Sequence, residues 1–236
     1  KALCVKEDSE YLVTYLLVKR FLQRLSRSSV DLSKLIRMID STENSSVINS
    51  LKSFLPDNMG RCKKVFYSTT NTATGRLTVT SGPQILIVPG PARGCLESSY
   101  EKGRILQIDI ISAEPKFALH LKGGNVPVDV YSYVSKNILK GEVQRKHTKL
   151  ITLCALYGQS AKNLEKHLPE QVNAREVIRK TRQYFDYDYL ISRLRGESRK
   201  GNFRNAVGRP IRIDNEDEHL LISYYLQSSV AEGSIL

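Results

Sequence analysis

Residues 145–158 read RKHTKLITLCALYG and place Arg145, Lys149, Leu153 and Tyr157 at intervals of four. An α-helix turns about 100° per residue, so each interval of four advances about 40° around the axis. The two cations and the tyrosine therefore share one face of a predicted helix. The apolar face behind them is formed by Leu150, Ile151, Cys154 and Ala155.

This stripe has two interpretations. Most amphipathic surface helices carry cations simply as their solvated face. The alternative is an anion site, in which Arg145 grips a terminal phosphate with its planar fork and Lys149 supplies a point charge to the others. Tyr157 and Gly158 close the stripe and add an aromatic surface to the cationic row, which favours a nucleotide.

The composition indicates a globular protein with a polyanionic partner. The 236 residues are 41% apolar and 25% charged, and the formal net charge is +12. Such a charge favours nucleic acid before an acidic membrane, because neutralising phosphates releases counterions. Neither a membrane span nor a signal segment is expected, and the four separated cysteines indicate a reducing compartment. We expect a cytoplasmic, nucleoid, viral or organellar protein that is not secreted, and an excised piece because Lys1 is no initiator methionine.

Helical and strand patterns alternate along the chain. A helical pattern over residues 11–55 predicts a hairpin of long helices, with Ser29 and Asp31 as caps. From residue 64, strands are predicted in VFYSTTNT, RLTVT and ILIVP, and a further strand over 104–111. Helices are predicted from 116 to 121 and over 128–195. A strand over 208–214 and a last helix over 216–235 complete the chain.

Two short segments carry candidate site residues. Asp109 lies in the apolar run RILQIDII, where a lone carboxylate is costly unless a cation such as Mg2+ compensates it. The plainer alternative is an aspartate at a strand end, half solvated. The segment TATGRL, residues 72–77, predicts a hairpin loop in which Gly75 takes a positive φ and Arg76 is exposed.

Some tempting residues are not assigned any chemistry. Asp186 and Asp188 look like a carboxylate pair, but in a predicted helix they point to different faces. The four histidines lack metal-ligand spacing, and the sequence has no GxxxxGK phosphate-binding loop.

In order along the chain, these segments resemble the family A DNA polymerases of the bacterial DNA polymerase I type. TATGRL matches the element that follows the thumb, and DIISAEPK at 109–116 is similar to the DYSQIELR pattern of motif A. RKHTKLITLCALYG resembles motif B, the O helix, and Gln227 stands at the glutamine of the QGTAAD-like segment. The resemblance spans nearly the whole chain.

The resemblance implies a role for each matching residue. Asp109 would hold catalytic Mg2+ ions in a two-metal centre, and Glu114 would crowd the ribose 2′ position. Arg145 and Lys149 would bind the incoming triphosphate, with Lys149 also assisting proton transfer to pyrophosphate. The remaining implied contacts are with DNA: Tyr157 near the templating base, Gly158 giving it room, and Arg76 and Gln227 at the minor-groove side of the primer-template end.

The sequence departs from the family pattern at three places. Leu153 stands where the family has Phe or Tyr, and Tyr131 stands where it has a phosphate-contacting His. In the family, the first position packs against the sugar and the second contacts the triphosphate. The sequence also ends at Leu236, before motif C, the His-Asp-Glu segment that supplies the second metal carboxylate.

The expected fold is α+β with a right-hand architecture, in which helical thumb and fingers surround a partial antiparallel palm sheet. The expected domains are a thumb-like segment at 1–60, the first part of the palm at 61–115, helical fingers at 116–200 and a return to the palm at 201–236. The implied function is Mg2+-dependent DNA synthesis from deoxynucleoside triphosphates on primer-template DNA, together with the remainder of the polymerase or a complementing chain. The alternatives are a non-catalytic DNA-binding protein on the same scaffold and a helical interaction module without salt-dependent DNA affinity.

The purified chain is expected to bind DNA but not to extend a primer, because the sequence offers Asp109 without a motif C carboxylate. The measurement is primer extension with Mg2+ and all four deoxynucleoside triphosphates. Robust extension by the 236-residue chain would contradict this expectation.

Overall fold

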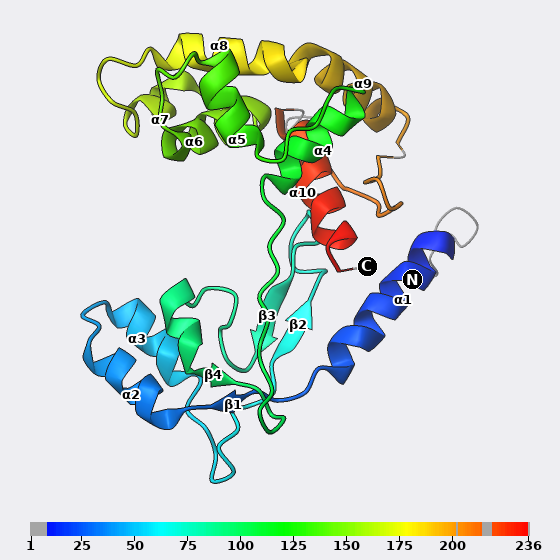
Figure 1. The fold of residues 1–236 in the computed structure, drawn as a ribbon. Coiled ribbons are helices and arrows are strands. Elements are labelled where there is room, and N and C mark those ends of the chain that lie inside the picture. The colour runs from blue at the N-terminus through cyan, green and yellow to red at the C-terminus, as the bar shows by residue number, and fades with distance from the viewer. Residues whose placement is uncertain (1–8, 202, 214–218, 236) are drawn as a thin grey trace. The chain divides into compact units, whose positions relative to one another are not determined.

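A computed structural model describes residues 9–201, 203–213 and 219–235. The chain folds into two compact units, Lys1–Ile108 and Asp109–Leu236 (Figure 1). Helices predominate, and the described strands form two small antiparallel sheets, as expected for the α+β class at this coarse level. The four domain ranges inferred from the sequence stay predictions.

Three helices contribute to the first unit: α1 (Ser9–Arg24), α2 (Leu32–Asp40) and α3 (Ser45–Lys52). Asp31 caps α2 by accepting a hydrogen bond from the backbone N–H of Lys34 at 2.9 Å, which confirms one expected cap. The other expected cap, Ser29, lies in a strand instead. The expected hairpin of long helices was wrong, because α2 and α3 are short and Asn44 caps the start of α3 only four residues after α2 ends.

Both sheets belong to this unit. Strand β1 (Ser29–Val30) pairs with β4 (Leu96–Glu97), and β2 (Phe66–Ser68) pairs with β3 (Thr78–Ser81). The β2–β3 pairing confirms the strands expected in VFYSTTNT and RLTVT. The expected strand in ILIVP was wrong: residues 85–87 form a turn that leads into the short 3₁₀ helix η1 (Gly90–Cys95).

The core of the first unit is small and gathers around α2 and α3. Leu35 and Leu51 are almost fully buried. The buried apolar residues that complete this cluster are Val30, Phe54, Cys62, Val88, Ala92 and Cys95.

The apolar run 104–111 forms no strand, contrary to the sequence prediction. A strand needs a hydrogen-bonded neighbour, and none of the described residues pairs with this segment. Its apolar side chains are exposed, with Leu106 at 82% and Ile108 at 89%. Residues 104–111, whose apolar composition predicts a buried strand, therefore remain unpaired.

The second unit is helical. Its elements are α4 (Ala113–Leu121), α5 (Val130–Tyr133), the π-helix η2 (Val134–Ile138), α6 (Arg145–Leu156), α7 (Ala161–Glu165), α8 (Ala174–Phe185), α9 (Tyr187–Arg199) and α10 (Leu221–Gly233). They confirm the helices expected over 116–121 and 128–195, with Pro115 in the first turn of α4. The last helix starts at Leu221, and residues 216–218 of the prediction lie outside the described residues.

The strand expected at 208–214 was wrong over its described part. Only Pro210 forms an isolated bridge, to Arg204, and Ile211 N–H donates to the carbonyl of Phe203 at 2.8 Å. Asp214 lies outside the described residues. The segment therefore forms a short turn with one isolated bridge and not a strand within a sheet.

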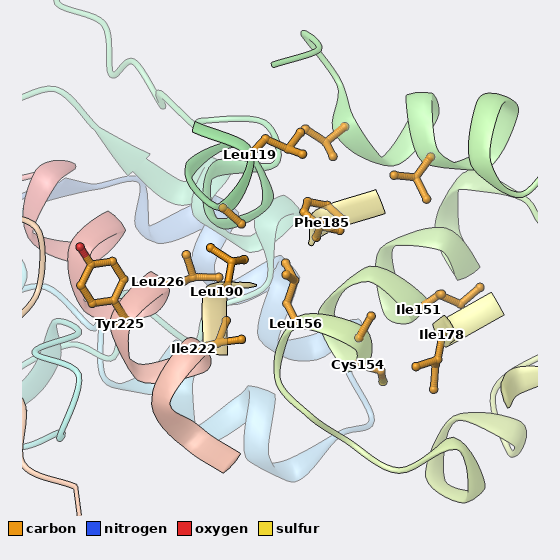
Figure 2. Packing of buried hydrophobic residues seen from close by; sticks show 14 of the residues in the cluster. Leu119, Ile151, Cys154, Leu156, Ile178, Phe185, Leu190, Ile222, Tyr225 and Leu226 are labelled. Atoms are coloured by element: carbon orange, nitrogen blue, oxygen red, sulfur yellow. The ribbon is translucent and has the colours of Figure 1, made fainter. Parts of the chain in front are cut away.

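The core of the second unit lies where α6, α8, α9 and α10 pack together. Leu156 of α6, Leu190 of α9, and Ile222 and Leu226 of α10 are almost fully buried and lie close together in Figure 2. Ile151 is likewise fully buried on the inner face of α6. This packing fixes α6, the helix that carries the cationic stripe.

A buried polar network ties the turn at 203–211 to α10. Arg209 Nη1 donates to Glu232 Oε1 at 2.8 Å, and their side chains are only 11% and 6% exposed. Asn205 Nδ2 donates to Glu232 Oε2 at 2.8 Å and to Ser228 Oγ at 2.9 Å. Because both charges are largely removed from water, losing one partner of this pair costs free energy.

Glu232→Ala should lower the free energy of unfolding by up to about 3–5 kcal/mol, because it removes a buried carboxylate that accepts from both Arg209 and Asn205. Urea unfolding at neutral pH measures this change. Glu165→Ala, at an exposed position on α7, is the control and should stay within about 0.5 kcal/mol of the unaltered chain. Equal effects of the two substitutions would contradict the stabilising role of the network.

Candidate functional site

Helix α6 presents the predicted stripe to solvent. Arg145 and Lys149 are exposed and Leu153 and Tyr157 are half-buried, whereas Ile151 is fully buried on the other face. One member of the expected apolar face was wrong: Leu150 is 40% exposed. Its place in the core is taken by Thr148 and Thr152, which are 0% exposed, because the buried face is centred one residue away from the predicted one.

The Asp129 side chain forms hydrogen bonds with residues at the starts of α5 and α6. Its Oδ2 accepts from Arg145 Nε at 2.6 Å and from Ser132 Oγ at 2.7 Å. Its Oδ1 accepts from the backbone N–H of Tyr131 at 3.1 Å, which caps α5. Burial opposes ionisation of this carboxyl group, but the hydrogen bonds from Arg145 and Ser132 outweigh it and hold the pKa of Asp129 well below its usual range.

Ser112 connects the same carboxylate to the start of α4. Its hydroxyl donates to Asp129 Oδ1 at 3.3 Å, and the residue is 6% exposed. The backbone of Ser112 is left-handed, with φ 56° and ψ 38°, a conformation that costs about 1–2 kcal/mol for an L-residue. The bond to Asp129 helps to hold this turn, through which the segment of Asp109 enters the helix.

Tyr131 lies beneath Arg145. The guanidinium carbon of Arg145 is 5.6 Å from the centroid of the Tyr131 ring, a cation–π distance. Tyr131 is 7% exposed, and burial raises its pKa to about 12, with the charge of Glu114 acting in the same direction. Tyr131 is therefore a neutral phenol that supports the cation at neutral pH.

Glu114 and Tyr157 join α4 to the end of α6. The Tyr157 hydroxyl donates to Glu114 Oε2. Both side chains are half-buried. The structure thus brings four sequence-predicted site residues into one cluster with Asp129, namely Glu114, Tyr131, Arg145 and Tyr157.

Other predicted site residues do not join this cluster. Lys149 is exposed, with no ion pair to any residue that the structure describes, and Leu153 lies beside it on α6. Gln227 is half-buried on α10. Arg76 belongs to the first unit, where it is exposed after Gly75, whose φ of 70° confirms the expected positive-φ turn.

Gly158 has a backbone that favours glycine. Its φ is 69°, and an added Cβ would lie 3.3 Å from both the Tyr187 hydroxyl and the carbonyl oxygen of His219. A side chain at this position would be strained and crowded. Glycine is therefore the residue that fits directly after Tyr157.

Asp109 does not by itself form a metal site. It is exposed in the unpaired segment, and no group of three or more potential ligands gathers anywhere in the described part of the chain. Mg2+ needs six oxygens and takes one or two carboxylates together with substrate phosphates. The described residues supply one carboxylate here and do not complete a two-metal centre.

Sequence reasoning missed Asp129 and Ser112. The available signal was Asp129 before the apolar residue Val130 with Ser132 three positions on, a typical helix N-cap pattern. That pattern predicts a cap but not the ion pair with Arg145, which lies 16 residues away.

The fold is similar to that of a DNA polymerase domain. No protein-family model and no curated protein matches the sequence, but 35 chains of solved structures match the fold. One is the POL domain of Pol1 from M. smegmatis in complex with DNA primer-template and dNTP, with a TM-score of 0.57 and 17% sequence identity. The match covers 98% of this chain and 49% of that chain, so the chain spans about half the length of this neighbour. At this identity the likeness concerns the fold alone.

None of the described helices is both long enough and apolar enough to span a bilayer.

Asp129→Asn should destabilise the chain at pH 7, because it removes the charge that pairs with Arg145 while keeping a side chain able to cap α5. The folded-state pKa of Asp129 is depressed. Its contribution is therefore complete above the unfolded-state pKa of about 3.9 and is lost as the pH falls through the folded-state pKa.

Urea unfolding between pH 7 and pH 2.5 measures this difference, which should shrink below about pH 4. Asp188→Asn, at an exposed carboxylate, is the control and should show no such trend. A difference for Asp129→Asn that stays constant over the whole range would contradict the role of the ionised carboxylate.

Proposed function

We propose that this chain is part of a DNA polymerase and takes part in template-directed nucleotidyl transfer from deoxynucleoside triphosphates to a primer 3′ end. The observation that carries the proposal is the likeness of its fold to a polymerase domain over 98% of the chain. The cluster of Glu114, Tyr131, Arg145 and Tyr157 in front of α6 supports it independently.

In the proposed right-hand architecture, residues 1–60 belong to the thumb and 61–115 to the palm. Residues 116–200 form the fingers and 201–236 return to the palm. The chain spans about half of its structural neighbour, so the proposed activity is that of a larger or split polymerase.

The proposed nucleotide site uses the exposed stripe of α6. Arg145 and Lys149 neutralise the triphosphate, because cations one helical turn apart match an extended anion. Tyr131 supports the Arg145 guanidinium from below, and Leu153 faces the sugar. Catalysis of this kind depends mainly on positioning and on charge neutralisation.

A triphosphate at Arg145 would compete with Asp129, which holds the guanidinium in the structure. Lys149 has no such competitor among the described residues. Lys149 is therefore the proposed first contact of the anion and the proposed proton donor to pyrophosphate.

The proposed contacts with the primer-template involve Arg76, Gln227, Gly158 and Tyr157. Arg76 is exposed at its turn, and Gly158 adopts a positive φ directly after Tyr157. For the metal we propose that Asp109 supplies one carboxylate toward Mg2+. One carboxylate does not complete a two-metal centre.

The second candidate function is a non-catalytic DNA-binding protein on the same scaffold. The observation that favours it is the exposed position of Asp109, which belongs to no group of three or more potential metal ligands among the described residues. This alternative keeps the affinity for DNA and omits the dependence on a bound triphosphate.

Lys149→Ala should weaken binding of a deoxynucleoside triphosphate to the chain–DNA complex about tenfold or more, because a charge-assisted contact is lost. Lys166→Ala, which removes an exposed lysine at the end of α7, is the matched control and should change affinity less than about twofold. Nucleotide titration of the chain bound to a primer-template measures both. Equal effects would refute the assignment of Lys149, and a complex that binds DNA without any nucleotide would favour the non-catalytic candidate.

A further inference from the structure

The first unit contains a hollow that the proposed nucleotide site does not involve. Its volume is about 1190 Å³, and the residues that line it all belong to the range 25–108. One wall is formed by η1 and β4, and another by the turn at 98–103 and the unpaired residues 104–108 that follow it. The hollow is therefore a feature of one compact unit.

The floor of this hollow is apolar. Phe54 and Cys62 line it and are only 3% and 1% exposed, and both belong to the core of the first unit. Ile85 and Leu96 also line the hollow and pack against the same core. A ligand in the hollow can therefore bury apolar surface against the core, which favours a ligand with an apolar body.

Three cationic side chains in the walls have no partner. Arg93, Lys102 and Arg104 line the hollow, and none of these side chains forms an ion pair or hydrogen bond with a residue that the structure describes. The Nε atom of Arg93 is removed from solvent and lacks an acceptor. Buried donors are normally paired, so Arg93 is a cation that the protein holds in the wall without supplying its counter-charge.

The carboxylate in the lining does not neutralise these cations. Glu97 lies beside Lys34, with 3.8 Å between Lys34 Nζ and Glu97 Oε1, and Lys34 also pairs with Asp31 at 3.0 Å. Lys34 belongs to the lining as well, so four cationic side chains and one carboxylate line the hollow, an excess of three positive charges. The hollow is therefore complementary to an anion.

A defined turn holds Lys102 at the wall. The backbone of Lys102 is left-handed, with φ 57°, which is unfavourable for an L-residue. The Gly103 N–H donates to the carbonyl oxygen of Tyr100 at 2.9 Å, and the Tyr100 N–H donates to Ser98 Oγ at 3.2 Å. A Cβ at Gly103 would lie 2.2 Å from Ser98 Oγ. Glycine at 103 and the two hydrogen bonds thus fix the turn that carries Lys102.

We infer that this hollow binds a small amphipathic anion, a molecule with an apolar body and one carboxylate or phosphate head group. The head group accepts from Arg93 and Lys102, since guanidinium and ammonium groups are the usual donors to such oxygens. The apolar body packs against the floor at Phe54 and Leu96. An inorganic anion would leave this floor uncovered, and an uncharged ligand would leave the cations unpaired. The inference is independent of the proposed function, because the proposed nucleotide site lies in the other unit.

The test uses two dyes that fluoresce more strongly in apolar surroundings: anilinonaphthalene sulfonate, an amphipathic anion, and phenylnaphthylamine, its uncharged counterpart. Fluorescence titration of the full chain gives the affinity for each. The sulfonate should bind about tenfold or more tightly than the uncharged dye, because charge-assisted contacts are added. Decanoate should displace the sulfonate, whereas inorganic phosphate at the same concentration should not.

Substitutions locate the binding site. Arg93→Gln should weaken sulfonate binding about tenfold or more and leave the affinity for the uncharged dye within about twofold. Lys102→Gln with Arg104→Gln alters two exposed side chains and tests the same site if Arg93→Gln does not fold. The matched control, Lys136→Gln with Lys140→Gln, removes two exposed lysines of the second unit and should leave both affinities within about twofold.

Three results would overturn the inference. Equal affinity for the two dyes would exclude a preference for an anion. Displacement by inorganic phosphate as effective as by decanoate would exclude a role for the apolar body. Sulfonate binding that is unchanged by Arg93→Gln and by Lys102→Gln with Arg104→Gln would place the ligand outside this hollow.

Discussion

The carboxylate of Asp129 is the group on which the arrangement of α4, α5 and α6 depends. One side chain caps α5, accepts from Ser112 before α4 and pairs with Arg145 in the first turn of α6. Three elements that are distant in sequence are thereby set relative to one another by a single charge. Because burial disfavours that charge, the arrangement is maintained only while the donors surround it.

The same arrangement explains why the site is composed of internal pairs. Arg145 pairs with Asp129 and the Tyr157 hydroxyl with Glu114, so these two predicted contact residues already have partners within the protein. An incoming anion exchanges partners with these groups and does not meet bare charges, which limits the net gain from each contact. Lys149 on α6 and Arg175 and Arg179 on α8 are exposed and form no ion pair with a residue that the structure describes.

The sequence predicted what depends on local periodicity and turn chemistry. The face shared by Arg145, Lys149 and Tyr157, the Asp31 cap and the positive φ of Gly75 follow from residues that are close along the chain. The face of α6 was misjudged at Leu150 because two buried threonines, Thr148 and Thr152, look polar in a sequence. Asp186 was taken for a residue within a helix, yet it adopts a left-handed conformation and ends α8. The role of Asp129 could not be predicted, since its partner lies far along the chain and the pairing is a tertiary event.

The unpaired segment 104–111 has a consequence for how this chain behaves in solution. Its backbone N–H and C=O groups make no backbone hydrogen bond among the described residues, and Leu106 and Ile108 are exposed beside them. An extended apolar edge of this kind is a template onto which a further strand can add. Self-association should therefore begin at this segment as the protein concentration rises. The cause would be the apolar character of residues 104–111, which also led to the prediction of a buried strand.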